Sequence, residues 1–336
     1  MAARSRTEDQ VKAALRVAEE AEATPEEKTE MLMQIAMGLQ TRPQAVEDLE
    51  AAVGLYRVAL DLCPPDHGLL SARVRARLGT ALMALPADDS SGLEQARDAF
   101  ETALGSLTAE GLNEEIAEAE MNLGLALQNL ASLGKARIQD AISAYQRALR
   151  TFDRQRHPKE FAILQNNLAT AFLSIPFTDE KSKMREALAV QAFEEGLSVV
   201  NLIDHPSEYA MLQNNLGNAL QYVSSSHRVE NGFRALEAYD EALKVRSPEN
   251  APGEYANTIA NKANCLANLP DDPARPEDGN PGNEAAAAGL YREALAIFDR
   301  LGEREKSEMV LAAMAELKSD QLPQDGRANG PNELAQ

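Results

Sequence analysis

The chain has 336 residues, of which 44% are apolar and only 4% aromatic, and acidic residues outnumber basic ones by 53 to 33, giving a formal net charge of −20. A chain with this negative charge repels phosphate backbones and anionic lipids. We therefore expect neither a nucleic-acid partner nor a membrane partner. The two cysteines exclude a disulfide framework, and no apolar run is long enough to predict a transmembrane helix. These features predict a cytoplasmic protein.

The first predicted element is an amphipathic helix over residues 6–22, within a capping region at 1–24. The chain then repeats itself. Residues 158–169 (PKEFAILQNNLA) and 206–217 (PSEYAMLQNNLG) are near copies, and a weaker copy starts at Pro252. Each copy ends on a small residue, and aligning the chain on that residue gives six positions separated by 41 to 48 residues. These are Gly38, Gly79, Gly124, Ala169, Gly217 and Ala263.

A second landmark follows each small residue: an aromatic residue, then Ala-Leu or Gly-Leu three positions later. The aromatic residues are Tyr56, Phe100, Tyr145, Phe193, Tyr239 and Tyr291. Helical spacing of apolar residues around both landmarks predicts two helices in each unit. The predicted repeats lie near 25–66, 67–110, 111–156, 157–204, 205–250 and 251–302.

The small residue has a packing role in this interpretation. Without a large side chain at Gly124 or Gly217, the second helix can approach the first closely, and its aromatic residue fills the adjacent space. Prolines at 158, 206 and 252 suit the first turn of a helix, where a missing N–H costs nothing. Because one hairpin cannot bury its apolar face alone, we expect neighbouring hairpins to stack.

The end of the chain departs from the repeat. Residues 270–283 (PDDPARPEDGNPGN) predict a long loop between the two helices of the sixth repeat. Residues 303–318 predict a C-terminal capping helix, and residues 319–336 have the composition of a disordered tail.

The pattern resembles the tetratricopeptide repeat (TPR), on the strength of Asn122-Leu123-Gly124, Asn215-Leu216-Gly217 and the spaced Ala141, Tyr145 and Ala148. The usual TPR has ~34 residues, whereas the repeats here are spaced 41 to 48 residues apart. The chain is therefore similar to the long-period, Asn-Asn-Leu-Gly type. The resemblance implies an all-α fold: a right-handed superhelical solenoid of about six TPR-like hairpins with terminal capping helices. It also implies that the first helices line a concave groove.

Asparagines recur at the positions that this resemblance places in the groove. The candidates are Asn122, Asn166, Asn167, Asn214, Asn215, Asn218, Asn261 and Asn264. Asparagine is a mediocre helix former, and its amide can both donate to and accept from a peptide backbone. Two interpretations stay open and are compatible: contact with an extended polypeptide, or hydrogen bonds that bridge adjacent repeats.

Arg73 and Arg77 lie one helical turn apart at groove-facing positions of the second repeat. They could grip a carboxylate or an acidic segment. Similar co-chaperone arrays clamp a carboxylate with a Lys-Asn pair in the first repeat, where Ile35 and Ala36 stand here. Salt bridges to neighbouring acids are therefore the favoured interpretation.

No phosphate-binding Gly-rich loop, His-Glu-x-x-His or Cys-x-x-Cys motif occurs. Cys63 and Cys265 are interpreted as small core residues, and His157 and His205 as turn residues before helices. We expect no cofactor, no metal and no enzymatic activity. The predicted function is a protein–protein interaction scaffold that binds a polypeptide segment in its groove. The alternative is an assembly or maturation chaperone for a specific enzyme complex.

Overall fold

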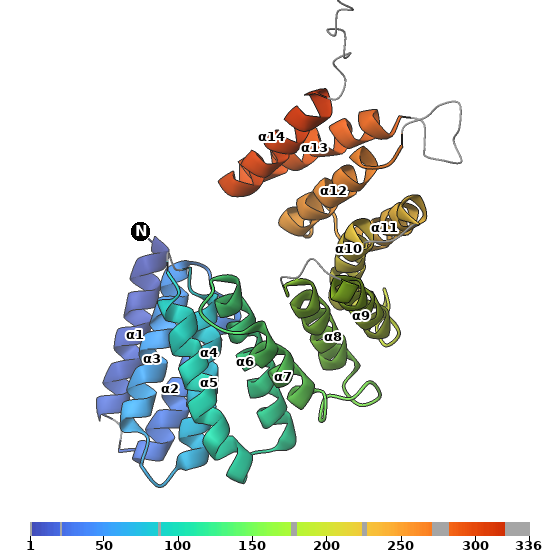
Figure 1. The fold of residues 1–336 in the computed structure, drawn as a ribbon. Helices are drawn as coiled ribbons and strands as arrows, with labels where there is room; N and C mark the ends of the chain where they lie inside the picture. The colour runs from blue at the N-terminus through green and yellow to red at the C-terminus, as the bar shows by residue number, and fades with distance from the viewer. Residues whose placement is uncertain are drawn as a thin grey trace, which may run out of the picture. The chain divides into compact units, whose positions relative to one another are not determined.

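The computed structural model describes residues 2–20, 22–86, 89–175, 180–223, 227–270 and 282–319. Within these ranges the chain forms fourteen α-helices and no β-strand (Figure 1). The all-α class and its construction from paired helices are as predicted. The chain divides into two compact units, residues 1–178 and 179–336.

The first unit contains eight helices, coloured blue to green in Figure 1. They are α1 (Ala2–Glu20), α2 (Pro25–Thr41), α3 (Val46–Leu62), α4 (Gly68–Ala84), α5 (Ser91–Glu110), α6 (Asn113–Ser132), α7 (Ile138–Ala148) and α8 (Pro158–Leu173). Each helix from α2 onward packs on the next, and the first helices of successive hairpins also contact each other: α2 with α4, α4 with α6 and α6 with α8. The second helices make no comparable contact in the described part of this unit. The first helices therefore pack more closely against one another than the second helices do.

The second unit contains α9 (Glu180–Leu197), α10 (Pro206–Tyr222), α11 (Arg228–Leu243), α12 (Pro252–Ala267), α13 (Asn283–Leu301) and α14 (Arg304–Ser319). The pairs α10–α11 and α12–α13 form hairpins, and α10 also contacts α12. The predicted fourth repeat, 157–204, supplies α8 to the first unit and α9 to the second. The sequence pattern gave no sign of this division.

The close packing of small and aromatic residues is confirmed in three hairpins. A Cβ atom added at Gly124 would lie 2.5 Å from the Tyr145 ring, and one added at Gly217 would lie 2.7 Å from the Tyr239 ring. Gly79 stands in the same relation to Phe100, at 2.8 Å. All three rings are fully buried. The glycines therefore remove the atom that would hold the two helices of each hairpin apart.

The first repeat needs a correction, because Gly38 does not take this role. No described atom lies within 4 Å of a Cβ placed at Gly38, whereas Ala36 is fully buried. The hydroxyl of Tyr56 donates to Gln40 at 2.7 Å, just as Tyr145 donates to Gln128 at 2.9 Å. Gln128 lies four residues after Gly124, and Gln40 lies four residues after Ala36. The small residue of the first repeat is therefore Ala36, and the predicted alignment was off by two positions.

Three linking turns explain part of the long period. An oxygen of Asp153, Asn201 or Ser247 accepts from backbone N–H groups two and three residues later. The carbonyl of the same residue accepts from the N–H four residues later, which is the last residue before the next helix. His157 and His205 occupy that last position, as predicted for turn residues. Each turn lets the chain reverse direction between hairpins at the cost of a few additional residues.

Asp153 makes one of these turns sensitive to pH. Hydrogen bonds from the backbone N–H of Arg156, from its guanidinium and from the N–H of Gln155 lower the pKa of Asp153 to about 2, against ~3.9 for an unfolded aspartate. Its stabilising contribution is therefore complete above about pH 4 and is lost as the pH falls towards about 2. We expect Asp153→Asn to unfold with a weaker pH dependence across that interval, as measured by urea denaturation at several pH values. Equal pH dependence of the two proteins would contradict this origin of the shift.

The terminal helices pack against the hairpins next to them. α1 contacts α2 and α3, and α14 contacts α12 and α13. Such contacts are those that a capping helix makes, and the capping role itself stays a prediction. The predicted loop at 270–283 and the predicted tail at 319–336 lie outside the described residues, apart from Pro270, Gly282, Asn283 and Ser319. No described helix combines the length and the hydropathy that a membrane span requires.

Candidate functional site

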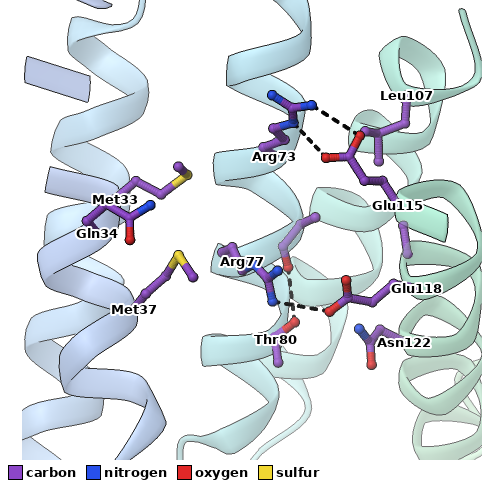
Figure 2. A pocket seen from close by; sticks show the side chains of 12 residues that line it. Met33, Gln34, Met37, Arg73, Arg77, Thr80, Leu107, Glu115, Glu118 and Asn122 are labelled. Atoms are coloured by element: carbon purple, nitrogen blue, oxygen red, sulfur yellow. Dashed lines mark hydrogen bonds and ion pairs between the residues drawn. The ribbon is translucent and has the colours of Figure 1, made fainter. Parts of the chain in front are cut away.

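A pocket of about 210 Å³ lies in the first unit, where α2, α4 and α6 meet (Figure 2). α2 contributes Met33, Gln34 and Met37; α4 contributes Arg73, Ala76, Arg77 and Thr80; α6 contributes Glu115, Glu118, Ala119 and Asn122; and Leu107 comes from α5. Three consecutive first helices thus converge on one site. Of the predicted groove residues, the pocket unites Arg73, Arg77 and Asn122.

The corrected register explains why α2 takes part. The groove-facing positions lie three and two residues before the small residue and one residue after it. Counted from Ala36, these positions are Met33, Gln34 and Met37, and all three line the pocket. In the second repeat the same positions are Ala76, Arg77 and Thr80, which also line it. When the first repeat is aligned on Ala36 and the second on Gly79, the same three positions line the pocket in both repeats.

Methionines form the apolar side of the pocket. Met33 and Met37 project from α2, opposite the charged side chains of α4 and α6 (Figure 2). Both are partly buried and pack against the core of the unit. Because methionine is unbranched and polarisable, such a surface adapts to apolar groups of different shapes.

Two ion pairs form the opposite side. Arg73 donates to both oxygens of Glu115, at 2.7 and 3.3 Å, and Arg77 donates to Glu118 at 3.1 Å. Each pair joins the second repeat to the third. The favoured interpretation of the two arginines, salt bridges to neighbouring acids, is thereby confirmed. The side chains are between 27% and 44% exposed, and pairs of that exposure contribute only ~0–1 kcal/mol.

Glu115 has a second structural task. Its carboxylate also accepts from the backbone N–H of Leu112 at 3.1 Å, at the start of α6. Partial burial acts to raise the pKa of Glu115, but the hydrogen bonds from Arg73 and Leu112 outweigh it and lower the pKa. Glu115 therefore stays ionised at neutral pH, and the pair with Arg73 holds the N-terminus of α6 against α4.

Two primary amides face the pocket from opposite sides, Gln34 on α2 and Asn122 on α6. Neither makes a hydrogen bond with any part of the chain that the structure describes, and each keeps donors and acceptors for another molecule. Thr80 differs, because its hydroxyl already donates to the carbonyl of Ala76 at 3.1 Å.

The other predicted asparagines bond mainly within the protein. In the second unit Asn261 donates to Asn214 at 3.2 Å, across adjacent repeats, and Asn214 donates to Asn215 at 3.0 Å. Asn264 donates across the same repeats to Gln221 at 2.9 Å and to Tyr222 at 2.6 Å. Bridging between repeats is thus what the structure shows for Asn214, Asn261 and Asn264.

Asn218 and Asn166 make hydrogen bonds within their own repeats. Asn218 accepts from the hydroxyl of Tyr239 at 2.7 Å, which ties the two helices of that hairpin together. In the first unit Asn166 is buried and donates to Asn167 at 3.3 Å. The equivalent contact between Asn214 and Asn215 shows that this pair is part of the repeat. Contact of any of these amides with a ligand stays a prediction.

This contrast between asparagines gives a test. Asn214→Ala removes a buried acceptor and leaves Asn261 without that partner, so we expect a loss of about 1–2 kcal/mol in the free energy of unfolding. Asn122→Ala removes no hydrogen bond that the structure describes and should change stability by less than ~0.5 kcal/mol. Urea denaturation of the two variants measures both values. Equal losses would mean that Asn122 has a structural partner.

Gln34, Glu115 and Glu118 belong to this site but were not predicted from the sequence. Glu118 follows Arg77 by 41 residues, about one repeat, and this spacing was a usable signal for the pair. Gln34 was hidden by the two-residue error in the first repeat. Among the described residues, no group of three or more His, Cys, Asp and Glu side chains could hold a metal ion.

Comparison with known proteins supports the fold. No protein-family model and no curated protein sequence matches the chain. Among solved structures, the apo form of the quorum sensor NprR from B. thuringiensis matches with a TM-score of 0.52 and 12% identity, over 94% of this chain and 99% of that one. A Rap protein complexed with Competence and Sporulation Factor matches with a TM-score of 0.45 and 11% identity, over 88% and 81%.

BtubC (BKLC) from P. vanneervenii matches with a TM-score of 0.37 and 18% identity, over 99% of this chain and 97% of that one. Of these three matches, the one to NprR has a TM-score above 0.5, and at 12% identity it supports the fold alone. Together with the paired helices and their glycine–aromatic contacts, it makes the chain a helical-repeat protein with a TPR-like fold.

Proposed function

We propose that the chain is a protein-interaction scaffold that binds an extended polypeptide segment along the first helices of its repeats. The observation that carries the proposal is the pocket between α2, α4 and α6. Gln34 and Asn122 present unused amides from opposite sides of this pocket, and methionines form an apolar surface on its α2 side. An extended backbone offers alternating N–H and C=O groups, which such amides bind, and its side chains offer the apolar contact.

The dimensions of the pocket favour this ligand class. Pockets for small molecules usually measure ~300–1,000 Å³, whereas this one measures about 210 Å³. A volume of that size suits one or two side chains of a longer chain. The pocket also lies between three successive first helices, a position from which a bound segment can continue along the same face in either direction.

The proposal also covers the type of repeat, the asparagine contacts in the second unit and the capping helices. The adjacent Asn166–Asn167 and Asn214–Asn215 pairs support the long-period Asn-Asn-Leu-Gly type of repeat. Asn215, Asn218 and Asn264 are only partly buried, and we propose that they add backbone contacts in the second unit while Asn214 and Asn261 hold its repeats together. The predicted array of repeats at 25–302, with α1 and α14 as caps, is proposed on the same basis.

Site-specific photo-crosslinking in the native cell tests the proposal. A photo-reactive residue at Gln34 or at Asn122 should capture a protein, which mass spectrometry then identifies together with the crosslinked peptide. The control is the same photo-reactive residue at Glu101, which is exposed on the second helix α5. Capture at Glu101 but not at Gln34 or Asn122 would contradict binding along the first helices.

A further inference from the structure

We infer that the segment bound in this pocket is basic and that it anchors through one uncharged aliphatic side chain, such as leucine or methionine, held against Met33 and Met37. This inference rests on the proposed function and names the chemistry of its partner. It follows from three observations: the apolar surface of α2, the charge balance inside the pocket, and an exposed acid one turn before Gln34 on α2.

The aliphatic anchor follows from the apolar surface. Met33 and Met37 lie one turn apart on α2 and both line the pocket, with Ala76 and Leu107 also on its lining. A side chain that displaces water from these groups gains ~25 cal/mol for each Å² of apolar area removed from solvent. A volume of about 210 Å³ admits an aliphatic side chain of ordinary size. The adaptable thioethers do not require a particular branching pattern.

The requirement for an uncharged anchor follows from the ion pairs. Arg73 and Arg77 are neutralised by Glu115 and Glu118, which leaves the pocket itself with no net charge. An anchor of either sign would have to replace one member of an existing pair and leave the other member without its partner. A neutral side chain leaves both pairs intact.

The basic character of the flanking residues follows from the surroundings. Glu30 lies one turn before Gln34 on the same side of α2, is exposed, and forms no ion pair with the residues that the structure describes. The chain as a whole carries a net charge of −20. A lysine or arginine next to the anchor gains attraction from Glu30 and from this long-range field, which also accelerates association at low salt.

Selection from a phage-displayed library of random peptides on the full chain tests the inference. We expect the enriched peptides to share an aliphatic residue close to lysine or arginine. An enriched peptide should bind Met37→Lys about tenfold more weakly than the unmodified chain, because the new charge enters the pocket. It should bind Met37→Leu with nearly unchanged affinity and Glu30→Lys more weakly, and circular dichroism verifies that each variant is folded.

The matched control is Met184→Lys, the same substitution at a methionine that is 68% exposed on α9, and it should bind as the unmodified chain does. Peptides that bind Met37→Lys as well as the unmodified chain, or peptides without an aliphatic residue, would overturn the anchor and leave polypeptide binding in place. An acidic consensus would overturn the charge assignment. Failure of the chain to enrich any peptide would count against the proposed function as well.

Discussion

Replacing Tyr145 with alanine is expected to destabilise the protein by about 3–5 kcal/mol, the usual loss for a large buried aromatic side chain. The ring is fully buried, packs against the backbone at Gly124 and donates its hydroxyl to Gln128 at 2.9 Å. The substitution therefore opens a cavity between α6 and α7 and removes a hydrogen bond. Urea denaturation of the variant and of the unmodified chain measures the difference.

Tyr222→Ala is the matched control. This tyrosine is 67% exposed at the end of α10, so its removal creates no cavity. Of the hydrogen bonds that the structure describes, the variant loses only the exposed one that Asn264 donates to the Tyr222 hydroxyl, and the substitution should cost less than about 1 kcal/mol. Similar losses for the two variants would mean that the aromatic residue of the second helix is not what holds a hairpin together. The burial of Tyr145 also raises the pKa of its phenol well above the ordinary value, and the ring is therefore neutral at physiological pH.

The second large effect is expected at Gly124. An alanine there would place its Cβ 2.5 Å and 2.6 Å from two atoms of the buried Tyr145 ring, a separation that forces either the ring or the helix to move. Overpacking of this kind costs about 1–3 kcal/mol, and it exceeds the ~1 kcal/mol that alanine gains over glycine as a helix former. We expect a net loss of stability together with an altered near-ultraviolet signal from the tyrosine.

Gly38→Ala, also in the first helix of a repeat, is expected to stabilise the protein, in contrast to Gly124→Ala. Because no described atom lies within 4 Å of the added Cβ, only the gain in helix propensity remains, and this variant should be about 1 kcal/mol more stable than the unmodified chain. The pair of variants separates close packing from intrinsic propensity. A stabilised Gly124→Ala would contradict the packing role of the small residue, and a destabilised Gly38→Ala would contradict the corrected register.

The sequence predicted the repeat because two unlike landmarks recur in phase. A glycine such as Gly217 and an aromatic residue such as Tyr239 are chemically unrelated, and their constant order requires two elements that meet at that point. The structure adds the reason, since the missing Cβ at Gly217 is the space that the Tyr239 ring fills. The helical hairpins and the close contact were therefore predictable.

The first repeat was misaligned because it lacks the distinguishing residues. Ala36 is a common residue in this Ala-rich chain, whereas Gly38 matched the glycines of later repeats. The register is revealed by the structure, through the burial of Ala36, the open space beside Gly38 and the hydrogen bond from Tyr56 to Gln40. The pocket was consequently recognised only in part, through Arg73, Arg77 and Asn122, and its methionine side was not connected with them.

The roles of the asparagines could not be separated from sequence. Asn122 and Asn261 occupy the same position relative to the small residue, yet Asn261 bonds to Asn214 and Asn122 bonds to no described residue. The difference depends on the residue that the adjacent repeat presents, which periodicity alone does not specify. The division of the chain near residue 178 likewise depends on how the helices pack, and no change in composition marks it.

Methyl NMR of the chain labelled on its methionines, free and bound to the segment that crosslinking identifies, tests the central claim most directly. We predict that the signals of Met33 and Met37 shift on binding, because both line the pocket. The signals of Met184 and Met309, which are 68% and 65% exposed in the second unit, should report whether other surfaces take part. Shifts at Met184 or Met309 with Met33 and Met37 unchanged would contradict binding between α2, α4 and α6.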